Sequence, residues 1–516
     1  MTAISDLADA CWARLTRNEP VYAVLAGLPP ESMARLDAGT VQERAAEADK
    51  LLADLDALPV PAAEADLAAV LRHVLTTEAD QPRVMWHLHP AAPYRANFQF
   101  DQTARLVLAP LSGSERVRLT AEFAELVRSS AWLLREQRQR GITVPGPAVE
   151  GVRTSWAALG EELRALLADR AVDAAVAEVA GEIEKSAAVA GDAVGLAHLP
   201  GGEAAYRALV QQETTLGLEP EELHRLGLDQ CAELSERMAE IRARLGGPAD
   251  EEEALAWVKA QGHLYADDPA AVADVYRRHI ARVEPRIGRL FHTRPRAPYD
   301  VQRLDPAAEA GMTFGYYAPP SSSRPVGRYH FNGSELQDRS LLTSAALILH
   351  ELVPGHHFHL ALQAENASLH PLQQHGAQIT AFNEGWGEYA SHLGWELGAY
   401  AEDWDAYGRL AHERFTAQRL VVDTALNLGF WDLDKARTFM RANTLESDRQ
   451  IASETLRYAT DLPAQALAYR SGFLAFRHAR EAAGAADPRT VHEAMLTGGA
   501  VPMPRMRERV AQSVGR

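Results

Sequence analysis

Cysteine is almost absent from this sequence, since only Cys11 and Cys231 occur among 516 residues. Two cysteines cannot form the disulfide framework of small secreted proteins or a thiolate metal cluster. Positive charge is also scarce: 52 Lys and Arg stand against 70 Asp and Glu, and the formal net charge is -18. Nucleic acids and anionic membranes attract basic surfaces. We therefore expect no nucleic-acid partner and no membrane partner.

Long hydrophobic runs are missing as well. The strongest apolar run, Leu341 to Leu349, is far shorter than the roughly 20 residues that span a bilayer. Near the N-terminus, Asp6 and Asp9 interrupt any apolar stretch and no Lys or Arg precedes them, which is not the pattern of a secretory signal. We therefore predict a cytoplasmic protein.

The remaining pattern is mostly helical. With 47% hydrophobic and 24% charged residues the composition is that of a globular protein, and apolar residues recur every three or four positions along most of the chain. Between about 294 and 335, Pro, Gly, Ser and aromatic residues are dense, which predicts short strands. We predict a mainly α, large multi-helix protein with a deep cleft and a small antiparallel β-sheet next to the metal-binding helix described below.

The segment from His350 to His357 carries the strongest chemical signal. A zinc hydrolase needs two imidazoles on the metal and a nearby carboxylate that takes a proton from water, and the usual helical arrangement is HExxH. Here Pro354 occupies the position of the second His. The Pro-Gly pair could loop out two residues and bring His356 into that position. We predict His350 and His356 as ligands and Glu351 as general base, with His357 as the alternative second ligand.

A second acidic motif follows 34 residues after His350, at Glu384 and Glu388. Their i, i+4 spacing places both carboxylates on one helical face. We predict Glu384 as the third metal ligand and Glu388 as the partner of the His350 N–H, which would orient that imidazole. The predicted cofactor is one Zn²⁺ per chain, with another divalent transition metal as the alternative.

Several segments together resemble a known family. They are HELVPGHH (350–357), NEGWGEYA (383–390), RPVGRYHFN (324–332), PAQALAYRSGF (463–473) and the region 206–228. This set is similar to the domain-of-unknown-function family 885 (DUF885), which is grouped with the gluzincin-like metallopeptidases. The resemblance implies a mainly helical fold with a long cleft and supports a zinc site with Glu384 as third ligand. The chain departs from the family at His359, where members often have Gln, and at Asn427, where they often have His.

Further candidates surround this motif. Tyr469 is, by resemblance, a donor to the oxyanion of the reaction, with core packing as its alternative role. Arg457 could hold a substrate carboxylate, which would give a carboxypeptidase-like enzyme, although a pair with Glu454 is the plainer role. Arg328 and Tyr329 alternate as in an edge strand that could bind an extended peptide, or they simply cover the core.

We predict an N-terminal helical region over residues 1–200 and a catalytic metallohydrolase region over 201–516, packed as one continuous two-lobed unit. The predicted function is zinc-dependent hydrolysis of peptide or amide bonds, with a peptide or small amide as substrate. One alternative is a biosynthetic hydrolase of a small non-peptide amide. The other is a non-catalytic helical scaffold with a vestigial metal site, which retention of Glu351 disfavours because a structural site needs no water-activating carboxylate.

Overall fold

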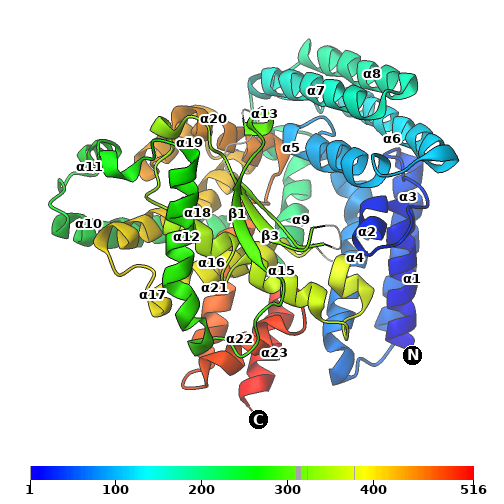
Figure 1. Ribbon diagram of the computed structural model, residues 1–516. Helices are drawn as coiled ribbons and strands as arrows, with labels where there is room; N and C mark the ends of the chain where they lie inside the picture. The colour runs from blue at the N-terminus through cyan, green and yellow to red at the C-terminus, as the bar shows by residue number, and fades with distance from the viewer. Residues whose placement is uncertain (1, 310–314, 322–323, 377, 516) are drawn as a thin grey trace.

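Helices make up most of the computed structural model, which describes residues 2–309, 315–321, 324–376 and 378–515. The prediction of a mainly α protein with a small sheet is confirmed (Figure 1). The helices of the first 200 residues are α1 (Ala3–Asn18), α2 (Pro20–Leu25), α3 (Ala38–Asp56), α4 (Ala65–Val84), α5 (Pro93–Ala96), α6 (Gly113–Gln139), α7 (Gly146–Leu167) and α8 (Arg170–Ala187).

Helices also make up most of the chain after residue 200. They are α9 (Gly202–Thr214), α10 (Pro220–Arg244), α11 (Glu251–Lys259), α12 (Pro269–Val283), α13 (Pro306–Glu309), α14 (Ser344–Glu351), α15 (His356–Glu365), α16 (Thr380–His392), α17 (Gly394–Leu397), α18 (Asp403–Asn427), α19 (Leu433–Asn443), α20 (Asp448–Leu456), α21 (Leu467–Ala482), α22 (Pro488–Leu496) and α23 (Met503–Val514). A π-helical turn, η10 (Arg457–Asp461), lies between α20 and α21.

The sheet differs from the prediction in its topology. Its strands are β1 (Tyr299–Arg303), β2 (Tyr316–Ala318) and β3 (Gly327–Phe331), in the order β1-β3-β2. β3 pairs antiparallel with β2 but parallel with β1, so the sheet is mixed and not purely antiparallel. Parallel pairing needs a long crossover connection, and the chain between β1 and β3 is long enough to supply it.

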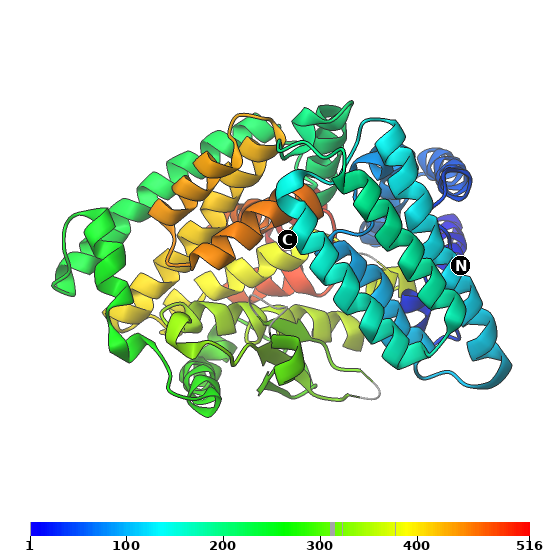
Figure 2. The ribbon, with the colours of Figure 1, turned by 90° about the horizontal axis from the view of Figure 1, so that it is seen from above.

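Helices from both ends of the chain share one core. The largest cluster of buried side chains contains Leu15 and Leu75 together with Trp386 and Phe473. A second cluster, which includes Trp156, lies among α6, α7 and α8, and these helices form a separate group in Figure 2. The first cluster contains residues from both sides of the boundary predicted at residue 200. That boundary stays a prediction.

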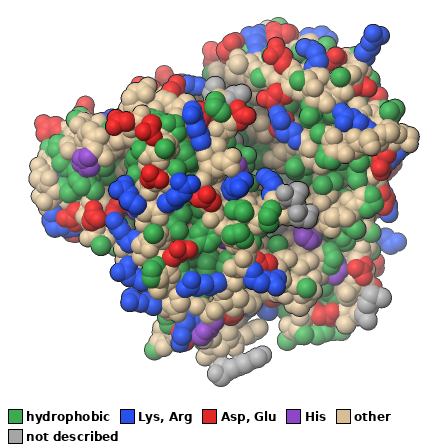
Figure 3. Space-filling model, in the orientation of Figure 1, with side chains coloured by type: hydrophobic (Ala, Val, Ile, Leu, Met, Phe, Trp, Pro, Cys, Tyr) green, Lys and Arg blue, Asp and Glu red, His purple; other side chains and the backbone are tan. Residues whose placement is uncertain are grey.

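The surface agrees with the charge balance of the sequence. On the face drawn in Figure 3, acidic and basic side chains are interspersed, and no large basic patch gathers there. Within the described residues, no helix combines the length and the apolar character needed to cross a membrane. The cytoplasmic location stays a prediction.

Candidate metal centre

The helix that carries His350 ends directly after the His-Glu pair. α14 stops at Glu351, and a new helix, α15, begins at His356. We expected one helix with two looped-out residues. This expectation is wrong, because one helix ends at Glu351 and a second helix begins at His356. The break nevertheless turns the first residue of α15 back toward His350, and the two imidazole centroids lie 4.6 Å apart.

Gly355 and Trp386 allow this sharp turn. A Cβ atom on Gly355 would lie 1.8 Å from the carbonyl oxygen of His350, so only glycine permits the two backbone segments to approach so closely. The buried indole N–H of Trp386 donates to the carbonyl oxygens of Pro354 at 2.9 Å and Gly355 at 3.2 Å. This bond ties the turn to α16, the helix that carries Glu384.

Three potential ligands converge at this turn. The Nε2 atoms of His350 and His356 each lie 3.4 Å from Oε2 of Glu384, and one donor atom from each residue lies within 4.8 Å of the others. In a tetrahedral zinc site with bonds of about 2.1 Å, neighbouring ligand atoms are separated by about 3.4 Å. The donor set and its spacing therefore fit a zinc ion, with one coordination position left for water or substrate.

His357, the alternative ligand, points away from this cluster. Its Nε2–H donates to the carbonyl oxygen of Ala297 at 2.9 Å, and its Nδ1 lies 2.9 Å from the hydroxyl of Tyr317. Both ring nitrogens are thus engaged, and the side chain is fully buried. The structure brings His356 to the ligand cluster, and His357 instead joins α15 to β2 and to the loop before β1.

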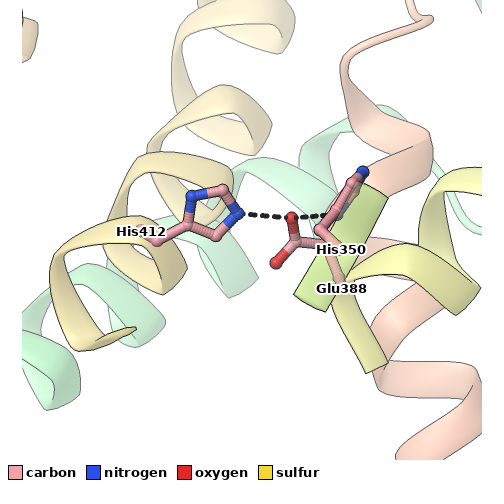
Figure 4. A group of neighbouring side chains, drawn as sticks. All are labelled: His350, Glu388 and His412. Carbon is pink, nitrogen blue, oxygen red and sulfur yellow. Dashed lines mark hydrogen bonds and ion pairs between the residues drawn. The ribbon is translucent and has the colours of Figure 1, made fainter. Parts of the chain in front are cut away.

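The carboxylate of Glu388 lies between the imidazole rings of His350 and His412 (Figure 4). Its Oε1 is 3.0 Å from Nδ1 of His350 and 2.8 Å from Nε2 of His412, and its Oε2 is 3.3 Å from the Arg409 guanidinium. His350, Glu388 and His412 also form a possible ligand group. Their separations are hydrogen-bond lengths, however, which suits a network that orients His350 better than a second ion site.

The electrostatics of the centre favour a bound cation. Burial lowers the pKa of His350, but the carboxylates of Glu384 and Glu388 outweigh burial and raise it to about 10. Burial raises the pKa of Glu384, yet hydrogen bonds and charge from His350 and His356 bring it well below its usual range. Burial likewise raises the pKa of Glu388, but His412 and His350 bring it well below its usual range. Both carboxylates therefore stay ionised and suit a positively charged partner, which an ion held by these residues would supply.

Glu351 stands beside the ligands without joining them. It is half-buried, and no described residue forms a hydrogen bond or ion pair with its carboxylate. Burial raises its pKa, and the neighbouring His356 and His350 partly offset this effect. A carboxylate with a raised pKa and a free oxygen is suited to exchange a proton with water at this position.

The ring of Tyr469 packs against the imidazole of His350. The two rings stack at a centroid distance of 6.2 Å, and the Arg419 guanidinium lies 4.5 Å above the tyrosine ring. Burial and the charge of Glu384 raise the pKa of Tyr469 to about 12, although two nearby Arg residues lower it. Its hydroxyl thus keeps its proton at neutral pH and can donate a hydrogen bond.

The family comparison agrees with the sequence motifs that surround this centre. Residues 20–510 match a family described as a bacterial protein of unknown function, DUF885. The chain belongs to the DUF885 family. No curated protein matches the chain.

Two solved structures are similar to this chain in fold. A presumed lipoprotein from Colwellia psychrerythraea is 21% identical, with a TM-score of 0.87 over 99% of this chain and 98% of the other. A presumed lipoprotein of unknown function from Shewanella oneidensis is 15% identical, with a TM-score of 0.74 over 98% of this chain and 99% of the other. At these identities the likeness establishes the fold alone.

The two departures from the DUF885 pattern have different surroundings. Asn427 is buried and hydrogen-bonded, donating to the carbonyl oxygens of Asp423 and Tyr458 at 3.0 Å each. His359 is also buried, but neither ring nitrogen has a hydrogen-bond partner among the described residues, and its ring lies 5.7 Å from that of His356. His359 is therefore the departure that reaches the metal centre.

The predicted substrate-binding residues fall into two groups. Arg457 donates to Glu454 at 3.2 Å and to Gln465 at 2.8 Å, which is the plainer pairing anticipated for it. Arg328 and Tyr329 lie on β3, but the expectation of an edge strand is wrong because β3 is the central strand of the sheet. Both of its backbone edges are already paired, so it cannot add an extended peptide.

Tyr329 itself belongs to the core. It is 1% exposed, and its ring packs edge-on against Tyr276 at 5.5 Å. Sequence reasoning missed other residues near the centre, namely Tyr317, Arg409 and His412. Tyr317 stacks on His356 at 6.4 Å, and the other two support Glu388 from α18. No local motif marks them, since only tertiary packing brings α18 and β2 to the site.

Proposed function

We propose that this DUF885 protein is a gluzincin-like, zinc-dependent hydrolase of peptide or amide bonds. The supporting observation is the geometry of the centre: an imidazole nitrogen of His350 and one of His356 each lie 3.4 Å from a carboxylate oxygen of Glu384, the separation expected between tetrahedral ligands. Beside them lies Glu351, a carboxylate without a hydrogen-bond partner among the described residues. A purely structural zinc site closes all four positions with protein ligands, whereas three ligands leave one position for the reaction.

The roles of the protein residues follow from their positions. Zinc, when bound at these ligands, supplies a Lewis acid that polarises the substrate carbonyl and makes water more acidic. Glu351 accepts the proton of the attacking water and passes it to the leaving amine nitrogen. Glu388 holds the imidazole of His350 in one orientation. Tyr469 donates its hydroxyl proton in a hydrogen bond to the oxygen on which negative charge develops.

A second candidate keeps the chemistry but changes the substrate to a small non-peptide amide. It is favoured by His359, whose two ring nitrogens stand without partners among the described residues, next to His356. A buried polar group of this kind requires a water or a substrate atom as partner. A screen with dipeptides, longer peptides and acyl-amino acids, run beside non-peptide amides, separates the two candidates.

The decisive test is Glu351→Gln, combined with elemental analysis of the purified protein. Glutamine keeps the size of the side chain but cannot accept a proton, so the variant should retain about one zinc per chain. Hydrolysis of a substrate found in the screen should fall by about 10²–10⁴-fold, the usual contribution of general acid–base catalysis. Glu402→Gln, at an exposed glutamate, serves as the matched control.

Two outcomes would contradict the proposal. If the wild-type protein binds no zinc after exposure to it, the ligand assignment fails. If Glu351→Gln cleaves the substrate at the wild-type rate, Glu351 is not the general base even though the metal is present.

A further inference from the structure

A cavity of about 490 Å³ lies apart from the candidate metal centre. Its walls come from segments that are distant in the sequence: the end of α6, the loops before α7 and after α8, the segment 87–89 and η10. Its volume is in the range of about 300–1,000 Å³ that is usual for small-molecule sites. None of the three candidate metal ligands belongs to its lining, so a molecule bound here would occupy a second site.

Hydrogen bonds between the walls keep this cavity in shape. The side-chain amide of Gln137 donates to the carbonyl oxygens of residues 86 and 88, at 3.1 Å and 3.0 Å, and so fastens the segment 87–89 to α6. Asn427 accepts from the N–H of Leu196 at 3.1 Å and donates to the carbonyl oxygen of Tyr458 at 3.0 Å, which joins the loop after α8 to η10. The walls are therefore already in place before a ligand enters, which lowers the cost of binding.

Four polar side chains of the lining have a buried atom without a hydrogen-bond partner among the described residues. These atoms are Nδ1 of His87, Nδ1 of His89, Nε of Arg138 and Oγ1 of Thr460. His89 is 3% exposed and Thr460 is 2% exposed. Buried polar groups in folded proteins are almost always hydrogen-bonded to protein, water or a ligand. Four such atoms around one cavity indicate that its occupant is polar.

The chemistry of these atoms requires an occupant that both donates and accepts hydrogen bonds. The Nε2–H of His87 donates to the carbonyl oxygen of Pro200 at 2.9 Å, so the Nδ1 of the neutral ring is an acceptor. The Nε–H of Arg138 can only donate, and the hydroxyl of Thr460 can do both. A hydroxyl group is the simplest partner for all three, because one oxygen atom both donates and accepts.

The lining also favours an uncharged occupant. Its described residues include no Asp or Glu, and the Arg138 guanidinium is already paired with the buried carboxylate of Glu182 at 3.0 Å. Burial lowers the pKa of His89 to about 4, so this imidazole is neutral at neutral pH. A charged ligand would lose its hydration here and would find no unpaired opposite charge in return.

We propose that this cavity binds a small uncharged ligand rich in hydroxyl groups, of the class of mono- and disaccharides. The ligand hydroxyls bond to His87, Arg138 and Thr460, and the apolar C–H faces of its rings pack against Leu196 and Leu199, which also line the cavity. This binding site does not depend on the proposed hydrolase activity, because it shares no residue with the candidate metal ligands.

The test is a ligand-observed NMR titration of the full-length protein with glucose, galactose and trehalose, beside glucuronate and inorganic phosphate as anionic probes. At least one sugar should bind, and more tightly than both anions. Thr460→Val keeps the shape of the side chain but removes its hydroxyl, so it should weaken sugar binding by about 2- to 10-fold. Ala193→Trp should abolish binding, because Ala193 is exposed at the cavity and an indole there would fill part of it.

The matched control is Ala57→Trp, at an exposed alanine after α3, and it should leave sugar binding unchanged. Circular dichroism checks that every variant is folded. If none of the three sugars binds, the buried polar atoms face water only and the proposal is overturned. Tighter binding of glucuronate or phosphate would refute the uncharged class. Sugar binding that survives unchanged in both Thr460→Val and Ala193→Trp would place the sugar elsewhere and would also refute the site.

Discussion

Replacement of Glu388 by glutamine tests how the interior supports the metal ligands. Glu388 is 1% exposed and lies 3.0 Å from His350 Nδ1 on the side opposite the ligand cluster. A glutamine side chain at this position would keep the shape and an acceptor oxygen but would lose the negative charge. A hydrogen bond to a charged group contributes about 1.5–3 kcal/mol, and a neutral one about 0.5–1.5 kcal/mol. The difference, roughly 1–1.5 kcal/mol, corresponds to about a tenfold weaker metal affinity.

The full effect should be larger, because Glu388 also fixes the orientation of two other groups. It accepts from His412 at 2.8 Å and from Arg409 at 3.3 Å. Loss of partners behind a ligand histidine typically weakens metal binding by about 10–100-fold. We expect a zinc dissociation constant raised within that range. Arg409 keeps its contact with Glu413 at 3.6 Å, so the variant should still fold.

The assay is competition for zinc against a chromophoric chelator, with circular dichroism of both proteins as a check on folding. Glu396→Gln provides the matched control, since Glu396 is exposed on the neighbouring helix α17 and pairs only at 3.4 Å with Arg480. An unchanged zinc affinity in a folded Glu388→Gln protein would refute the supporting role. A loss of the same size in Glu396→Gln would show that the effect is not specific to this network.

Two further predictions follow from the site. His356→Ala should remove most of the zinc measured by elemental analysis, whereas His357→Ala should retain zinc and lose thermal stability, because it breaks the contacts with Ala297 and Tyr317. The reverse pattern of zinc loss would show that the ligands are wrongly assigned. Burial raises the pKa of Asp461 to about 7, although two Arg residues lower it. The pKa of Asp461 in the folded protein is above its value of about 3.9 in the unfolded chain, so the stability of the wild type falls as the pH rises between these two values. At pH 8, Asp461→Asn should therefore be more stable than the wild type, by at most about 4 kcal/mol. At pH 4 it should not be more stable. Urea unfolding of both proteins at the two pH values measures this, and an equal difference at both would contradict it.

The sequence by itself determined the helical class of the protein and the ligand candidates. Apolar spacing of three and four residues is a local property, and it predicted helices wherever tertiary packing did not override it. The pairs His350–Glu351 and Glu384–Glu388 were recognisable for the same reason, since their chemistry follows from residue types at short spacing. Their assignment to a metal was possible because imidazoles and carboxylates in this pattern suit zinc.

Other features depended on contacts between distant segments. Neither the pairing of β3 with both of its neighbours nor the break between α14 and α15 could be read from local pattern, and both predictions about them failed. Only the folded chain shows that His356 lies in the candidate ligand cluster, whereas Tyr317 and the backbone at residue 297 occupy both nitrogens of His357.

The same reason explains why the surroundings of His359 could not be read from the sequence. Only the folded chain shows that this buried side chain lies beside His356 and that neither of its ring nitrogens has a hydrogen-bond partner among the described residues. Spacing along a helix is encoded over a few residues, so the sequence determined the ligand motifs. Hydrogen-bond and ion-pair partners in the interior come from elements that are far apart in the chain, such as α14, α16 and α18 around Glu388, so only the tertiary structure decided which polar groups are paired.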